Sequence, residues 1–145
     1  MQFITRHEAS RHQYQATGGE RLAALATFLD SLRPGRLTLG LWFGNGRGCA
    51  VGLAAATEPW FQAQGLRLKG VERPSLCHPV YRESSDWEAV AEFFGLTVAE
   101  AYELFSAAAY GGNLQPAPRT VADRIRQHLA ARDPADAAVC APVPA

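Results

Sequence analysis

The chain has 145 residues, 48% of them hydrophobic and 19% charged, which indicates one globular domain and excludes a disordered protein. Its 14 basic and 14 acidic residues cancel, so the composition gives no electrostatic reason to expect a nucleic acid or an anionic membrane as partner. No apolar run is long enough for a signal peptide or a membrane span. Three cysteines without a CxxC pair favour reduced thiols, and we predict a cytoplasmic location.

Residues 1–19 have little apolar periodicity and are predicted to form an N-terminal arm. A single globular domain is predicted over residues 20–131, followed by a flexible Ala/Pro-rich tail over residues 132–145. Within the domain, apolar residues recur at the spacing of one helical face, and glycines and prolines separate the runs. The predicted helices cover residues 20–32, 49–56, 59–64, 86–94, 98–110 and 119–131.

These elements predict a mainly α fold, a compact single-domain helical bundle. Residues 66–69 and 79–82 can pair as two short strands around a proline-containing loop, which allows a minor two-stranded β element. Residues 36–43 are either a strand or a buried irregular segment. The clearest helix boundaries are Gly95, which ends one helix, and Thr97 with Glu100, which have the spacing of a capping box.

The charges are unevenly distributed along the chain. Residues 1–82 carry ten bases and five acids, whereas residues 83–118 carry six acids and no base. We predict that this second segment forms an acidic face. The alternative is that its carboxylates lie on an ordinary solvated helix surface. The candidate partner-binding residues on this face are Glu92, Glu100 and Glu103.

The glycine-rich residues 44–48 predict a sharp turn that places Cys49 at the start of a buried helix. A thiol at a helix N-terminus is favoured as thiolate, which is how many catalytic cysteines are placed. Such an enzyme needs a base, and the candidates are His78 and His128. The alternative is that Cys49 is a small buried residue, with Gly52 one turn later allowing a neighbour to pack closely.

Other kinds of site lack the required residues. The adjacent pair Cys77 and His78 points to opposite faces of an extended segment, so we predict no metal and no cofactor. Residues 44–48 lack the GK[ST] ending of a phosphate loop. The helices on either side of Gly95 have the spacing of a helix-turn-helix, but this segment has no lysine or arginine to contact a phosphate.

Several motifs occur together along residues 36–130. They are Leu41-Trp-Phe43, Gly48-Cys-Ala-Val-Gly-Leu-Ala54, Trp60-Phe61 followed by Gly65-Leu66, Phe93-Phe-Gly-Leu-Thr97 with Glu100-Ala101 and Leu104-Phe105, and Val121-Ala-Asp-Arg-Ile125. This set resembles a family of small bacterial and phage proteins that share a CGTxACxxGWA-like helix start and a later FFGL, EAxxLF and VAxRI pattern. The first cysteine of that pattern is absent here, and Leu53 replaces its tryptophan. The resemblance implies a small helical fold and assigns no activity.

The sequence therefore predicts a small non-enzymatic interaction or regulatory protein that binds an unknown protein partner through its acidic face at residues 83–118. The first alternative is a hydrolase or transferase that uses Cys49 as nucleophile with His78 or His128 as base. A second alternative, a phage-associated effector that acts on a host system, comes from the resemblance alone.

Overall fold

The computed structural model describes residues 15–140, with side chains described as far as Arg132. Six α-helices lie in this part of the chain: α2 (Gly18–Asp30), α3 (Ala50–Thr57), α4 (Pro59–Ala63), α5 (Asp86–Phe94), α6 (Val98–Phe105) and α7 (Pro118–Cys140). Two 3-10 helices join them, η1 (Pro34–Arg36) and η2 (Ala107–Tyr110). The strands are β1 (Phe43–Gly44), β2 (Arg47–Gly48), β3 (Arg67–Lys69), β4 (His78–Tyr81) and β5 (Ser84–Ser85).

Helices predominate as predicted, but the fold is not a pure helical bundle. Strands β1 and β2 form a two-stranded antiparallel sheet, and β3, β4 and β5 form a second antiparallel sheet in that order. The predicted hairpin is confirmed, with Leu68 opposite Pro79. The third strand was not predicted, because two residues are too few to produce a pattern of alternation.

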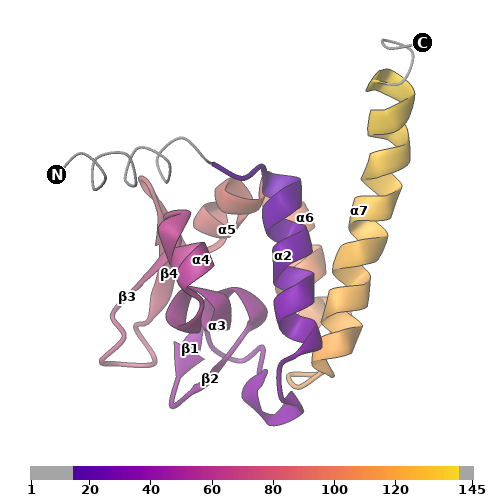
Figure 1. Cartoon of the computed structure of the whole chain (residues 1–145). Coiled ribbons are helices and arrows are strands. Elements are labelled where there is room, and N and C mark those ends of the chain that lie inside the picture. The colour runs from indigo at the N-terminus through magenta and orange to yellow at the C-terminus, as the bar shows by residue number, and fades with distance from the viewer. Residues whose placement is uncertain (1–14, 141–145) are drawn as a thin grey trace, which may run out of the picture.

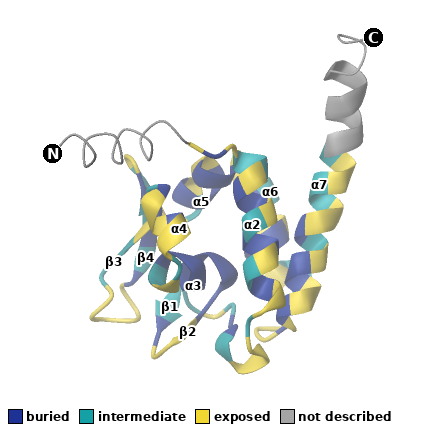
Figure 2. Cartoon of the chain, in the orientation of Figure 1, coloured by how far each residue is buried: buried dark blue, intermediate teal, exposed yellow. Residues whose placement is uncertain are grey.

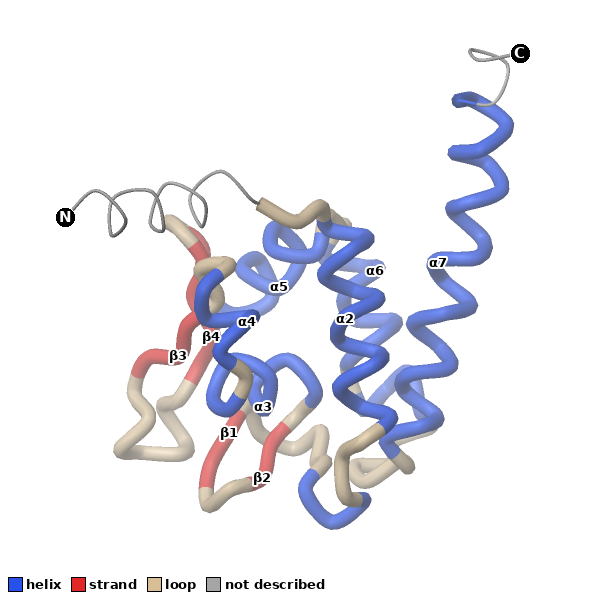
Figure 3. Tube along the Cα trace, viewed as in Figure 1, coloured by secondary structure: helices blue, strands red, loops and turns tan. Residues whose placement is uncertain are grey.

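The helices and the sheets occupy different sides of the molecule. Helix α2 packs along α7, and α6 lies behind them, whereas the sheet with β3 and β4 lies beyond α4 and the strands β1 and β2 lie below α3 (Figure 1). The tube trace shows the same separation, with all strands on one side (Figure 3). Helix α5 packs on β4 and also contacts α2 and α6, so it joins the helical side to the sheet side.

Helix α3 lies at the centre of the core. Its residues 50–55 are all buried (Figure 2), because alanine, glycine, valine and leucine let neighbouring elements approach it from every side. A Cβ on Gly52 would collide with the backbone carbonyl of Trp42, and the same carbonyl approaches Gly48. The prediction that Gly52 allows a close neighbour is therefore confirmed, and the neighbour is the Trp42 backbone.

The glycine-rich segment makes the predicted sharp turn. Asn45 and Gly46 have φ angles of 55° and 77°, and they connect β1 to β2 as a two-residue hairpin loop. Positive φ at both positions is typical of a type I′ turn, for which Asn-Gly is the preferred pair. Before this turn, residues 37–42 form an irregular segment with one isolated bridge, from Leu37 to Gly48.

Several helix boundaries differ from the prediction. Helix α2 begins at Gly18, because Thr17 and Glu20 form a capping box that starts it earlier. Helix α7 runs to Cys140 rather than to residue 131, so residues 132–140 of the predicted tail have helical backbone. The helix predicted over 98–110 is interrupted at Ser106 and continues as η2. Residues 1–14 of the predicted arm lie outside the described residues.

Candidate functional site

A pocket of about 290 Å³ opens between α5, α6 and the irregular segment before β1. No charged side chain is among the residues that line it, and most of the lining is aliphatic or aromatic. The lining residues are Leu39, Gly40, Leu41, Trp42, Cys49, Pro74, Ser75, Cys77, Trp87 and Phe105. A concave, largely apolar site of this kind is typical of ligand and side-chain recognition.

Two tryptophans pack against each other in the wall of this pocket, and Tyr102 packs on one of them outside it. The ring centroids of Trp42 and Trp87 are 5.0 Å apart with a tilt of 56°, and those of Trp87 and Tyr102 are 4.4 Å apart with a tilt of 43°. Trp42 and Trp87 are only half-buried. Partly exposed aromatic rings that pack on one another provide a rigid apolar surface that loses little entropy when a partner binds.

Exposed apolar side chains adjoin the residues that line the pocket. Tyr102 is 47% exposed and stacks on Trp87, whereas Leu76 is 56% exposed and lies between Ser75 and Cys77 in the chain. Leu114 is 51% exposed, and its carbonyl accepts a hydrogen bond from the Leu39 amide. Exposed apolar residues around an apolar pocket indicate an interaction site more strongly than single ones scattered elsewhere.

Two thiols from distant parts of the chain lie in the pocket wall. Cys49 precedes α3, and Cys77 precedes β4; both are free and buried. Burial raises the pKa of the Cys77 thiol, and the nearby carboxylate of Glu72 raises it further. Their proximity could not be predicted from the sequence, since 27 residues separate the two cysteines and no motif connects them.

Cys49 is the N-cap residue of α3. Its sulfur accepts a hydrogen bond from the Gly52 amide at 3.4 Å, and the thiol donates to the Trp42 carbonyl at 3.8 Å. Burial raises its pKa to about 11, although the amide donors at the helix start act in the opposite direction. Desolvation therefore outweighs the helix N-terminus, and the thiol is fully protonated at neutral pH.

The two candidate bases lie elsewhere. His78 begins β4, and its Nδ1 lies 2.9 Å from the carbonyl oxygen of Leu76. His128 lies on α7, and its buried Nε2 has no hydrogen-bond partner among the described residues. Neither imidazole hydrogen-bonds Cys49 or lines its pocket. Within residues 15–140, the structure thus does not bring a base to Cys49 in the way that a nucleophilic cysteine requires.

Two of the three predicted partner-binding carboxylates have contacts within the protein. Glu92 accepts a hydrogen bond from the Ser84 hydroxyl at 2.7 Å and lies 3.6 Å from the Arg82 guanidinium. Glu100 accepts a hydrogen bond from the Thr97 amide, which lowers its pKa. The carboxylate of Glu103 makes no hydrogen bond or ion pair with another described residue.

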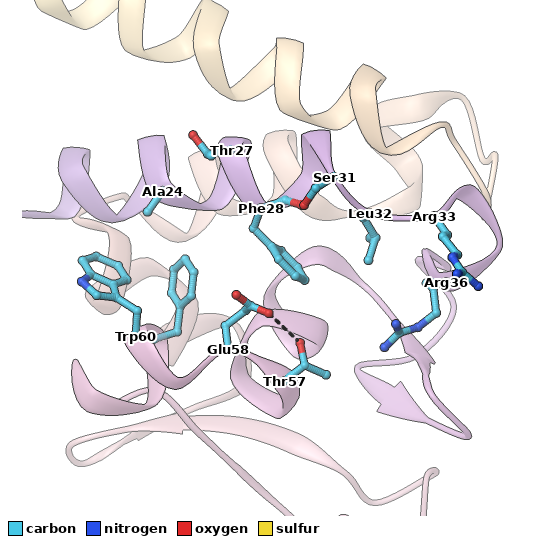
Figure 4. A pocket seen from close by; sticks show the side chains of 11 residues that line it. Ala24, Thr27, Phe28, Ser31, Leu32, Arg33, Arg36, Thr57, Glu58 and Trp60 are labelled. Carbon is cyan, nitrogen blue, oxygen red and sulfur yellow. Dashed lines mark hydrogen bonds between the residues drawn. The ribbon is translucent and has the colours of Figure 1, made fainter.

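A second groove, of about 630 Å³, runs between α2 and the helices α3 and α4. Arg33 and Arg36 lie at one end of it and Trp60 at the other, with Glu58 between them (Figure 4). The Nε of Arg36 already donates to the Gly46 carbonyl, and Glu58 accepts a hydrogen bond from Thr57. Charges of both signs line this groove, so it favours no particular class of ligand.

Arg21 is a structurally important residue that the sequence reasoning missed. It is 5% exposed, and its guanidinium lies 4.3 Å from the centroid of the Phe93 ring. All five of its N–H groups donate hydrogen bonds, to Gln15, Gln64, Tyr81 and the Phe93 carbonyl. Its position four residues before Leu25, on the apolar face of the predicted helix, was the signal that could have revealed it.

The described part of the chain holds neither a cluster of metal ligands nor a membrane-spanning helix. Over this part of the chain, no three His, Cys, Asp or Glu side chains come together as a metal site would need. None of its helices is long and apolar enough to cross a membrane.

Comparison with known proteins gave no relative: no family model, no curated protein and no solved structure matches this chain. The geometry of the described residues is therefore the basis for proposing a function.

Proposed function

We propose that the chain is a non-enzymatic binding protein that recognises a partner protein through the face built by residues 83–118. The observation that carries the proposal is the apolar pocket beside Trp42 and Trp87, which adjoins the exposed side chains of Tyr102 and Leu114. The segment 83–118 contributes Trp87, Phe105 and this exposed tyrosine to the site. A pocket that accepts one anchoring side chain at the centre of a wider face is a common arrangement in protein recognition.

The environment of Cys49 supports a binding role over catalysis. The thiol already caps α3, its pKa is raised to about 11, and no imidazole among the described residues contacts it. The enzyme alternative would need a thiolate and a base at this point. Cys49 therefore fits a structural role, as a buried residue in the pocket wall, better than a catalytic one.

The proposal can be tested by filling the pocket without disturbing the fold. A Cβ on Gly40, which lines the pocket, would meet its nearest neighbours, Thr38 and Leu114, at 3.7 Å or more, which is ordinary contact, so Gly40→Phe adds bulk beside Leu114 at the edge of the pocket at little strain. Gly35→Phe is the matched control, because no atom lies within 4 Å of a Cβ at that position. A displayed library of random dodecapeptides is panned against the full chain, and the enriched peptides are measured by fluorescence anisotropy.

We expect enriched peptides that share an apolar anchor, and Gly40→Phe should weaken their binding at least about tenfold, a loss of about 1.4 kcal/mol. The Gly35→Phe variant should bind them normally. Equal binding to both variants, or failure of the library to enrich, would contradict the proposal.

The resemblance to small bacterial and phage proteins, and the effector role that it suggests, stay a hypothesis. Its most direct test is the identity of the neighbouring genes. Genes for phage structural or lysis proteins would support the effector role, and a housekeeping operon would contradict it.

A further inference from the structure

The elements that wall the pocket carry charge of one sign only. Helices α5 and α6 together contain five carboxylates and no lysine or arginine. The other contributions to the wall, residues 39–42, Cys49 and residues 74–77, contain no charged residue. The apolar pocket therefore lies on a locally acidic face, although the whole chain is neutral.

Three of the five carboxylates are available to a partner. Glu92 and Glu100 are engaged within the protein, as described above. Asp86 and Glu88 are exposed and directly flank Trp87 in the sequence, and Glu103 is exposed and directly follows Tyr102. In the described part of the chain, none of these three side chains makes a hydrogen bond or an ion pair.

The bases near this face cancel only part of those charges. Arg82 pairs with Glu92 and lies 4.9 Å from the centroid of the Tyr81 ring. Arg124 donates to the Glu103 backbone carbonyl and lies 4.6 Å from the centroid of the Tyr110 ring. Across the pocket, Arg73 precedes the segment 74–77, but it follows Glu72 directly, so this pair is neutral.

The pocket interior has the opposite character to its surroundings. It contains the indole rings of Trp42 and Trp87, aliphatic side chains and two protonated thiols, but no carboxylate. A cation that entered it would lose its hydration without gaining an ion pair, which is unfavourable. An apolar side chain would bury its surface in the pocket without this loss of hydration. A bulky apolar side chain has a volume that fits the pocket of about 290 Å³.

From this arrangement we propose the chemistry of the partner: a peptide segment of another protein in which one bulky apolar side chain enters the pocket and flanking lysines or arginines meet Asp86, Glu88 and Glu103. This inference rests on the proposed function, because it names the partner of the same pocket. The apolar anchor supplies most of the affinity, whereas the surrounding charges select the partner and accelerate its association.

The test uses the full chain and three labelled synthetic peptides measured by fluorescence anisotropy. The first has a central phenylalanine with two lysines on each side; the second replaces the lysines by glutamates; the third keeps the lysines and replaces the phenylalanine by serine. We expect the first to bind at least about tenfold more tightly than either of the others at 50 mM salt. Its advantage over the glutamate peptide should shrink at 500 mM salt, because salt screens exposed charges.

Charge reversal on the protein supplies the second measurement. The double variant Glu88→Lys with Glu103→Lys should weaken binding of the first peptide at least about tenfold, whereas Glu58→Lys, in the other groove, should leave it unchanged. Equal binding of the lysine and glutamate peptides would overturn the inference about charge. If Gly40→Phe still blocks both peptides, the proposed function nevertheless stands. Tight binding of the serine peptide would also overturn it, since the contact would then be purely electrostatic. Binding that is insensitive to Gly40→Phe would instead reject the proposed function itself.

Discussion

The backbone carbonyl of Trp42 lies so close to Gly52 that a Cβ on residue 52 would overlap its oxygen. This contact fixes the segment that carries one wall of the pocket against the central helix α3. Gly52 lies within a regular helix, so its backbone conformation does not require glycine. Glycine is needed there because the Trp42 backbone leaves no room for a side chain.

Gly52→Ala should therefore destabilise the protein, although alanine is normally the better helix former by about 1 kcal/mol. The added methyl group must displace the Trp42 backbone, and overpacking of this kind costs about 1–3 kcal/mol. We expect a net loss of about 1 kcal/mol in the free energy of unfolding, measured by chemical denaturation. Gly35→Ala is the control, because that position is open, and a loss of the same size there would show that crowding by Trp42 is not the cause.

The Cys49 thiol should make stability fall with pH in the alkaline range. Its pKa is about 11 in the folded protein and 9.0 ordinarily, so between these values the folded state holds a proton that the unfolded state has released. The unfolded state then binds fewer protons, and the free energy of unfolding decreases as pH rises from about 9 to about 11. Cys49→Ser should remove this component, which is measured as the difference between the two unfolding curves as a function of pH.

Thiol labelling distinguishes the structural role of Cys49 from the catalytic one. In the variant Cys77→Ala with Cys140→Ala, Cys49 is the single thiol. A pKa raised by two pH units leaves about a hundredfold less thiolate at pH 8, so native Cys49 should react with iodoacetamide about a hundredfold more slowly than the same chain in denaturant. Labelling of the native chain that is faster than that of the unfolded chain would restore the enzyme alternative.

Arg21 should contribute more to stability than any exposed arginine. Arg21→Ala would leave the buried oxygens of Tyr81 and Phe93 without this donor, and Gln64 would keep only the Ala16 amide; unsatisfied buried groups cost about 1–3 kcal/mol each. Partial rearrangement reduces the sum, and we expect a loss of about 3 kcal/mol in chemical denaturation. Arg33→Ala, at an exposed position, should change the free energy of unfolding by less than about 0.5 kcal/mol. Equal losses for the two variants would show that the buried hydrogen bonds of Arg21 do not stabilise the fold.

The two helices of the acidic segment allow a matched test of capping. The Thr97 hydroxyl accepts a hydrogen bond from the Glu100 amide at 3.0 Å, whereas Ser85 starts α5 without a side-chain capping bond. Thr97→Ala should therefore cost about 1 kcal/mol and Ser85→Ala close to nothing, measured by thermal or chemical unfolding. Similar losses for both would show that the capping hydrogen bond does not stabilise α6 as proposed.

Local features of this molecule were readable from the sequence because they depend on neighbouring residues. The capping box at Thr97, the helix end at Gly95 and the sharp turn at Asn45 each follow from the conformational preferences of a few adjacent residues. The mainly helical character follows in the same way, from the period of apolar residues. The third strand of the sheet, β5, and the extension of α7 to Cys140 did not follow, since β5 is too short and residues 132–140 lack an apolar stripe.

The sequence by itself thus determined the helices, their caps and an acidic segment at residues 83–118. Only the tertiary structure decided that Trp42, Cys77 and Trp87 wall one pocket, that Glu92 is already paired with Arg82, and that burial of Cys49 outweighs its helix terminus. The physical reason is that desolvation, ion pairing and cavity shape depend on residues far apart in the chain, whereas turns, caps and periodicity depend on residues within one or two helical turns.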